Sequence, residues 1–406
     1  MPVTTRLRLA SVAACLVAAG LQACGEATGP PKPLALAVVG AGGGHSCGLT
    51  LEGVVYCWGA NDAGQLGIGA SDTNPHPTPE RTTGGGGLGF VTLSVGDSHA
   101  CALTADGSAY CWGAGRGGRL GDGSGSDRAT PVPVQGGLAF ASLSAGGEHT
   151  CAVTRAGVAY CWGANSRGQL GDSSTTDRLV PARVAGTLAF VSVTAGAFHS
   201  CGLAAGSVAY CWGDNSEGQL GDTSPASLCL SSCGRGPISG SFAPVPVSAG
   251  LVFASLTAGT PHSCGVAMGG AAYCWGDGGY GQLGNGSQNN SLVPVPVVGG
   301  LAFTSLSARQ LHTCGIAADN RAYCWGWNPD GQLGNGSTSW NGAPGSTTPV
   351  RVSGGLFFTS ISAGGDHTCA VAPGGAAYCW GAGSRGQLGN GATQLLTVPV
   401  PVAGGR

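Results

Sequence analysis

A pattern of His-x-Cys, nine further residues and Cys-Trp-Gly occurs seven times along this chain of 406 residues. The seven cysteine pairs are Cys47–Cys57, Cys101–Cys111, Cys151–Cys161, Cys201–Cys211, Cys264–Cys274, Cys314–Cys324 and Cys369–Cys379. A repeat of about fifty residues is typical of units that share a continuous core, as in a propeller or a solenoid. We therefore do not expect one conventional single-core enzyme fold.

Each unit contains about four short β-rich stretches separated by glycine-rich turns. The units fill residues 34–406, and the first and last units match the others. A closed ring of such units covers both faces of every blade, whereas an open solenoid needs atypical units at its ends. We therefore expect an all-β, closed seven-bladed β-propeller with about four short antiparallel strands per blade.

Composition narrows the range of partners. Charged residues make up 9% of the chain, and the formal net charge is −2. Such a chain has no basic stripe that could follow a phosphate backbone, so we expect no nucleic-acid partner. The 78 glycines recur at equivalent points of the units, which indicates turns rather than disorder.

The N-terminus has the pattern of an export signal. Residues 1–23 carry Arg6 and Arg8 followed by an apolar run that is too short to span a bilayer. The run ends in Leu-Gln-Ala-Cys, which resembles the lipobox of bacterial lipoproteins and makes Cys24 the expected lipidation site. Residues 24–33 would then form a short glycine- and proline-rich linker. We expect an extracytoplasmic protein of the bacterial cell envelope, an outer-membrane lipoprotein held to the membrane only by its lipid; simple secretion is the alternative.

The hairpin inside each unit can place its two cysteines opposite each other. In most units a glycine stands where a three-residue loop needs a left-handed residue, as Gly107 does between Cys101 and Cys111. Antiparallel pairing then puts the two cysteines directly opposite, with Cβ atoms about 4.5–5.5 Å apart, close to what a disulfide accepts. In an oxidising compartment we expect a disulfide in every unit, and a further local one between Cys229 and Cys233.

Metal binding is the rival interpretation of the same residues. His149, Cys151 and Cys161 would share one face of a sheet and could hold zinc or copper. No fourth ligand recurs, so the disulfide is favoured, and we expect neither a metal nor another cofactor. We expect the seven repeated histidines to bond main-chain groups at strand starts, and the Tyr and Trp of each Tyr-Cys-Trp-Gly to pack between blades.

Three segments of the repeat resemble the regulator of chromosome condensation repeat family. They are Ala145 to His149, Tyr160 to Gly163 and Asn165 to Gly171, with equivalents along residues 34–406. The resemblance implies a seven-bladed β-propeller. This chain departs from the family at both cysteine positions, which usually hold aliphatic or small residues other than cysteine.

The differences between units point to a binding surface. Units one, four and six are longer than the others, and equivalent loops of a propeller lie on one face. The candidate partner-binding residues in these loops are His76, Arg81, Arg235 and Trp340. We find no nucleophile–base pair, phosphate-binding loop or carboxylate dyad outside the repeat, so we expect no catalytic activity.

The leading hypothesis is a monomeric binding scaffold for a protein or an envelope glycan. The family resemblance implies two alternatives. One is nucleotide exchange on a small GTPase, as in a eukaryotic member of the family. The other is inhibition of a secreted enzyme, since a bacterial propeller of this family inhibits β-lactamases.

Overall fold

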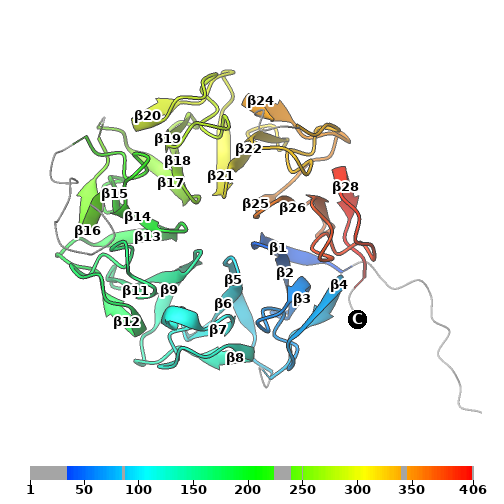
Figure 1. The fold of residues 1–406 in the computed structure, drawn as a ribbon, viewed down its shortest axis with the longest axis horizontal. Coiled ribbons are helices and arrows are strands. Elements are labelled where there is room, and N and C mark those ends of the chain that lie inside the picture. Colours follow the sequence, from blue (N-terminus) through cyan, green and yellow to red (C-terminus); the bar gives the residue numbers. More distant parts are fainter. Residues whose placement is uncertain (1–33, 85–86, 224–238, 249, 340–344, 405–406) are drawn as a thin grey trace, which may run out of the picture. The chain divides into compact units, whose positions relative to one another are not determined.

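A computed structural model describes residues 34–404 except 85–86, 224–238, 249 and 340–344. They form seven four-stranded antiparallel sheets, which confirms the expected seven-bladed propeller (Figure 1). The first strand of every blade lies nearest the centre of the ring, and the fourth lies at its rim. The described residues contain no helix long enough to cross a bilayer, since the only helix is the short η1 (Arg116–Gly118).

The strands occupy equivalent places in all blades. The first strands are β1 (Leu36–Ala41), β5 (Phe90–Val95), β9 (Phe140–Ala145), β13 (Phe190–Ala195), β17 (Phe253–Ala258), β21 (Phe303–Arg309) and β25 (Ser360–Ala363). The second strands are β2 (His45–Thr50), β6 (His99–Thr104), β10 (His149–Thr154), β14 (His199–Ala204), β18 (His262–Ala267), β22 (His312–Ala317) and β26 (His367–Val371).

The third strands carry the Cys-Trp-Gly motif, and the fourth strands close each blade on the outside. The third strands are β3 (Val55–Asn61), β7 (Ala109–Gly113), β11 (Ala159–Gly163), β15 (Ala209–Asp214), β19 (Ala272–Gly276), β23 (Ala322–Gly326) and β27 (Ala377–Gly381). The fourth strands are β4 (Asp72–Arg81), β8 (Arg128–Pro133), β12 (Arg178–Arg183), β16 (Gly240–Pro246), β20 (Ser291–Pro296), β24 (Ser346–Arg351) and β28 (Leu396–Pro401).

No blade combines strands from the two ends of the propeller, because every blade is built from four consecutive strands. Blade seven meets blade one through a main-chain hydrogen bond of 2.8 Å from Leu36 N to Gly375 O and a bridge between Ala35 and Ala376. The two ends of the propeller therefore meet at an ordinary interface between blades, which we call a seam, and no blade is shared between them.

The core is divided among the seven seams. At the seam between blades three and four, Trp212 packs with Cys151, Cys161 and Leu170 of the preceding blade and is fully buried. Phe190 lies beside it, with ring centroids 5.8 Å apart. The same set recurs at each seam, so each blade supplies one tryptophan that covers the face of the blade before it.

The strand register follows the hairpin expected from the sequence. In blade three Cys151 pairs with Cys161, and Gly157 has the left-handed φ of 79° that closes the loop. In blade four, where the sequence departs from the pattern, Gly206 and Ser207 both adopt positive φ. The extra length of unit one divides between two places: Cys57 pairs 23 positions on with Glu80, against 21 for Cys161 and Ala182, and the connection to the next blade is also longer.

Candidate functional site

The cysteine pairs form one disulfide in each blade. All seven pairs expected between neighbouring strands are bonded, with Cα atoms 4.0–4.1 Å apart. Because each sulfur is bonded to its partner, these cysteines offer no thiolate to zinc or copper. The expected bridge between Cys229 and Cys233, and the expected lipid site Cys24, lie outside the described residues. No three His, Cys, Asp or Glu side chains within the described ranges are grouped to hold a metal ion.

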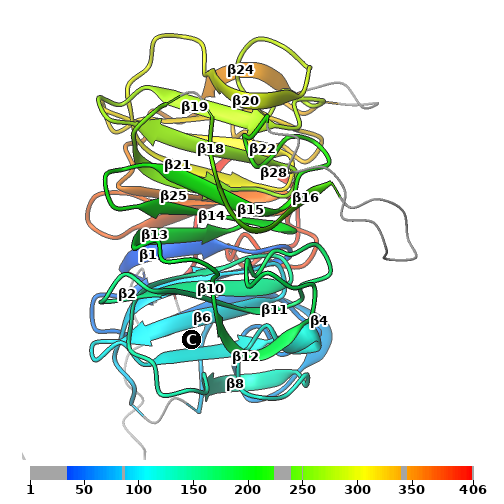
Figure 2. The ribbon, with the colours of Figure 1, turned by 90° about the vertical axis from the view of Figure 1, so that its left-hand side faces the viewer.

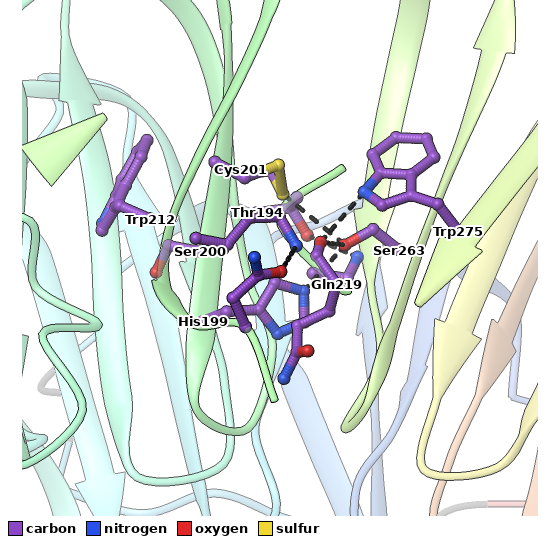
Figure 3. The surroundings of a disulfide bond; sticks show 12 residues. Thr194, His199, Ser200, Cys201, Trp212, Gln219, Ser263 and Trp275 are labelled. Atoms are coloured by element: carbon purple, nitrogen blue, oxygen red, sulfur yellow. Dashed lines mark hydrogen bonds between the residues drawn. A yellow bond between two sulfur atoms is a disulfide. The ribbon is translucent and has the colours of Figure 1, made fainter. Parts of the chain in front are cut away.

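The repeated histidines bond across the seams. In Figure 3, His199 of blade four lies beside the Ser263 hydroxyl of blade five, with Nε2 2.8 Å from Oγ. Ser263 in turn donates to the main-chain oxygen of Gln219 at 2.9 Å, which also accepts from Trp275 Nε1. Since the hydroxyl proton is used on the carbonyl, the serine oxygen must accept from a protonated Nε2. The expected main-chain partner was therefore wrong for this residue: the ring reaches a side chain of the next blade.

Six seams share this histidine–hydroxyl contact. The pairs are His99–Thr150, His149–Ser200, His199–Ser263, His262–Thr313, His312–Thr368 and His367–Ser46. All these rings are fully buried, and burial lowers the pKa of His149, for example, to about 3. The imidazoles are thus neutral at physiological pH and serve packing and hydrogen bonding.

The seam between blades one and two is different. Ala100 stands where the other blades have Ser or Thr, so the buried His45 has no hydroxyl partner across this seam. Gly40 stands where the first strands of other blades have Ser or Thr, and a Cβ there would lie 2.5 Å from Val95 Cγ2. A valine side chain thus occupies the space that a hydroxyl group uses at the other seams.

The two faces of the ring carry different connections. One face, which we call the loop face, holds the turns between first and second strands and the loops between third and fourth strands. The other, the hairpin face, holds the hairpins between second and third strands and the connections between blades. Figure 2 shows the ring from the side, with strands running between these two faces.

The two predicted binding residues that the structure describes, His76 and Arg81, do not come together on the loop face. His76 lies on β4 and is 15% exposed; its Nε2 is 3.1 Å from Asp72 Oδ2, and its Nδ1 is 2.6 Å from Glu80 Oε1. Burial is the largest single influence on the pKa of His76 and lowers it. The hydrogen bonds and charges of Glu80 and Asp72 together outweigh burial, so the pKa is raised. Arg81 ends β4 opposite Tyr56 and lines a hollow with the hairpin residues Gly53–Val55, so it faces the other side. Arg235 and Trp340 lie outside the described residues.

His76 occupies a position of the repeat rather than of an insertion. It pairs with Gly59, as Arg128 pairs with Gly113 and Arg178 with Gly163. Each of these cationic groups meets an aspartate of its own blade; the Arg128–Asp122 and Arg178–Asp172 contacts are 2.7 Å. In blades four to six the same position is serine, so this charge pair is confined to blades one to three.

Three aromatic side chains that the repeat does not require lie on the loop face of blades four to six. Phe198 is 38% exposed in the turn between β13 and β14. Tyr280 of blade five and Trp327 of blade six are partly exposed, with ring centroids 4.4 Å apart in an edge-to-face arrangement. Sequence reasoning missed these three, although each departs from a position that is small or polar in most other units.

Two partly buried carboxylates, Asp330 of blade six and Asp366 of blade seven, interact electrostatically on the loop face. Asp330 follows Trp327 by three residues, and its charge contributes to raising the pKa of Asp366 in blade seven. Burial is the main cause that raises the pKa of both carboxyls. Neither carboxylate forms an ion pair with a described residue.

An arginine crosses the centre of the ring. Arg309 replaces the glycine of Ala-Gly-x-x-His in unit six, and its Nη2 lies 2.7 Å from Asp97 Oδ1 of blade two. Nη1 donates to Val95 O at 2.9 Å. In most other units a side chain at that place is blocked; a Cβ at Gly196 would lie 2.8 Å from His199 Cε1. Arg309 therefore joins blades that are far apart in the sequence.

Comparison with known proteins agrees with this architecture. The family model described as RCC1-like domain matches residues 19–356, and models of the regulator of chromosome condensation (RCC1) repeat match residues 358–387 and 374–406. The Arabidopsis thaliana ultraviolet-B receptor UVR8 is 36% identical over 28% of this chain and 25% of its own length. The human probable E3 ubiquitin-protein ligase HERC3 is 40% identical over 24% of this chain and 9% of its own length.

The chain thus spans a quarter or less of the length of these two curated relatives. Among solved structures, Prp20p from Saccharomyces cerevisiae is similar, with a TM-score of 0.74, 21% identity and 87% coverage of both chains. At that identity the likeness shows the fold alone.

Proposed function

This chain belongs to the RCC1-like domain family, and from that premise we propose that it is an exported binding scaffold whose loop face docks a partner. The partner is a protein or an envelope glycan, and the chain has no catalytic activity of its own. The observation that carries the proposal is that Phe198, Tyr280 and Trp327 are at least partly exposed on the loop face, with Tyr280 and Trp327 in contact. Partly exposed aromatic side chains of this kind are common anchors at interfaces.

The disulfides support the exported location. One in each blade is consistent with an oxidising compartment, because disulfides rarely persist in the reducing cytosol. An export signal in residues 1–23 and a lipid on Cys24 complete this proposal, with anchoring at the bacterial cell envelope. Mass spectrometry of the membrane fraction would detect the acylated N-terminal peptide, whereas a free N-terminus released into the medium would favour secretion.

The absence of catalysis is part of the proposal and rests on where the titratable groups lie. Seven of the eight histidines are buried at the seams, so their imidazoles are not placed to exchange protons with a substrate. HERC3 is named a probable ubiquitin ligase, but the match covers 9% of it, so we do not extend that activity to this chain.

The test is affinity capture from envelope extracts with the purified propeller. We expect the triple variant Phe198→Ala, Tyr280→Ala and Trp327→Ala to lose the captured partner. Phe357→Ala is the matched control, because Phe357 is 47% exposed on the hairpin face, against Arg321. Equal capture by both variants would contradict a loop-face scaffold. The same preparation can be assayed for nucleotide exchange on small GTPases and for β-lactamase inhibition, which tests the two alternatives.

A further inference from the structure

The chain enters the propeller at the hairpin face. Ala35 forms a bridge with Ala376, and Leu36 N donates to Gly375 O at 2.8 Å; both partners lie in the hairpin between β26 and β27. From this face β1 runs towards the loop face as the strand of its blade nearest the centre of the ring (Figure 1). A segment that precedes Leu34 is therefore attached to the inner part of the hairpin face.

The length of the linker limits which face can lie on a membrane. In the proposed lipoprotein, residues 25–33 join the lipid on Cys24 to Leu34, and this segment spans about 31–36 Å when extended. To bring the loop face to the bilayer, the linker would pass three outer strands and then the length of a strand, about 34 Å in all. The shorter route through the ring is crossed by Arg309, which is bonded to Asp97. Only the hairpin face can therefore approach the bilayer without stretching the linker fully.

Exposed apolar side chains are concentrated on the hairpin face. Of the 14 large apolar side chains exposed among the described residues, eight lie in the hairpins, in the connections between blades or at the start of a first strand. The five most exposed of them are Leu51, Val91, Val191, Met268 and Phe357. Five of the remaining side chains lie in or beside fourth strands at the rim, and one lies on the loop face. The hairpin face thus offers apolar contacts in several blades around the ring.

The two faces also differ in charge. Among the described residues, the turns, loops and strand ends of the loop face hold 14 carboxylates and seven arginines. The hairpin face holds three carboxylates, Glu52, Asp106 and Asp319, and five arginines in hairpins or at the ends of fourth strands; Glu80 lies within β4. The loop face is therefore strongly negative, and the hairpin face is slightly positive. An anionic lipid surface repels the first and attracts the second.

We propose that the hairpin face rests on a lipid bilayer and that the loop face points away from it. The lipid on Cys24 supplies the attachment, so weak apolar contacts with the headgroup region suffice to set the orientation. The partner-binding aromatic side chains of the loop face are then presented to the space beyond the membrane. This inference rests on the proposed lipid anchor and assigns the membrane-facing side of the scaffold.

Met268 is a natural probe of the hairpin face, because it is the only methionine among the described residues and is 63% exposed. Hydrogen peroxide converts an accessible methionine to its sulfoxide, which mass spectrometry quantifies. The full-length protein is reconstituted into vesicles of phosphatidylethanolamine and phosphatidylglycerol, and Phe198→Met supplies a second probe on the loop face. On vesicles we expect Met268 to be oxidised at least about fivefold more slowly than after the vesicles are dissolved in detergent, and position 198 to change less than about twofold.

A paired variant tests the apolar contacts themselves. Leu51→Glu with Val191→Glu puts two carboxylates on the hairpin face, and it should return the oxidation rate of Met268 on vesicles to within about twofold of the rate in detergent. The matched control, Leu179→Glu with Leu292→Glu, adds the same charge at exposed positions of β12 and β20 and should leave the protection in place.

Three outcomes would overturn the proposal. The first is equal oxidation of Met268 on vesicles and in detergent, and the second is protection of position 198 in its place. The third is protection of Met268 in isolated envelopes but not on lipid vesicles, which would assign the hairpin face to a protein partner. Equal loss of protection in both paired variants would also contradict the apolar contacts, since net charge alone would then explain the effect.

Failure of this inference is distinguishable from failure of the proposed anchor. If the N-terminal peptide is acylated and Met268 is unprotected on vesicles, the anchor stands and the orientation is wrong. If the peptide carries no lipid and added vesicles still protect Met268, the orientation stands and the anchor is wrong. If neither acylation nor protection is found, both are wrong.

Discussion

The seam between blades one and two and the other six seams achieve the same packing with different chemistry. At the six, a hydroxyl of one blade accepts from the buried histidine of the blade before it. A second hydroxyl, such as Ser144, accepts a main-chain N–H of the next blade, Ala195 N, at 3.0 Å. At the first seam both hydroxyls are missing, and Gly40, Val95 and Ala100 fit together instead.

The comparison shows that all seven seams share the burial of the tryptophan, whereas the hydrogen bonds from histidine to hydroxyl to carbonyl are found at only six. Trp112 of blade two is as fully buried as the other repeat tryptophans, and its Nε1 still donates to Gln65 O at 3.1 Å. Folding replaces hydrogen bonds to water by hydrogen bonds within the protein, so one such bond adds only about 1 kcal/mol to the free energy of unfolding. Burying a large aromatic side chain adds several times that amount. The apolar seam can therefore replace the polar one if the shapes match.

Lowering the pH should have the largest effect on stability. It also tests whether the buried histidines of the two kinds of seam respond alike. The folded-state pKa is about 4 for His45 and about 3 for His149, below about 6.5 in the unfolded chain. Unfolding therefore takes up protons, and each such histidine removes up to about 1.4 kcal/mol of stability per pH unit as pH falls from about 6.5 towards its folded pKa.

We expect the unfolding midpoint in urea to fall steeply between pH 6.5 and 4.5. A His149→Gln variant should take up about one proton fewer on unfolding. His76 should act in the opposite direction: its pKa is raised, so its contribution is present below pH 6.5 and is lost as pH rises through the folded pKa. A midpoint that stays constant over the acid range would show that the seam histidines are not held neutral by folding.

Gly40→Ser should come next, because it places a hydroxyl group at the seam that has no room for one. Val95 Cγ2 lies 2.5 Å from the new Cβ position, and overpacking of this kind costs about 1–3 kcal/mol. Adding Val95→Ala recreates the contact that Ser144 makes with Ala195 N at the seam of blades three and four, and it should recover most of the loss. Thermal unfolding of the two single variants and the double variant measures the coupling; additive effects would mean that the two residues do not compensate each other.

Ser200→Ala converts a polar seam towards the apolar one without the compensating valine. His149 Nε2 loses its acceptor, while Gln169 O keeps its bond from Trp212 Nε1. An orphaned buried donor costs about 1–3 kcal/mol, and we expect the lower half of that range. Ser200→Thr is the control, since Thr150 fills the equivalent place. An unchanged unfolding midpoint for Ser200→Ala would mean that the hydroxyl is dispensable at the seam between blades three and four.

Ala100→Ser should give the smallest change, and in the stabilising direction. The new hydroxyl could accept from His45 Nε2 and donate to Gln65 O, as Ser200 does with His149 and Gln169. A gain of up to about 1 kcal/mol is expected for one restored buried hydrogen-bond chain. The denaturant midpoint measures it; a lower midpoint would indicate that the seam around Val95 cannot admit even one oxygen atom.

The fold and the cysteine pairing could be predicted because the repeat carries them. The hairpin loop fixes the register of Cys151 and Cys161, and seven copies of the pattern leave no remainder for another architecture. The hydroxyl partner of the histidines also had a sequence signal, since Ser or Thr precedes most of the first cysteines. It was missed because that signal refers to the neighbouring blade, 51 residues away for His149 and Ser200.

The aromatic contact on the loop face could not be predicted in the same way. Tyr280 and Trp327 hold positions that vary between units, so no periodicity marks them as a pair. Their contact depends on how one blade is placed against the next, as does the contact of Arg309 with Asp97 across 212 positions of the chain. The repeat motif predicts that the ring closes, but it does not give the distances between side chains of different blades.

Every disulfide among the described residues joins cysteines only 10 positions apart within one blade, and none of these seven crosses a seam. The correct thiols are therefore neighbours as soon as a single hairpin has formed, before the rest of the ring is complete. Oxidation can proceed from the N-terminus onwards without isomerisation between distant cysteines. A gene that gained or lost one whole repeat would keep every remaining cysteine with its own partner.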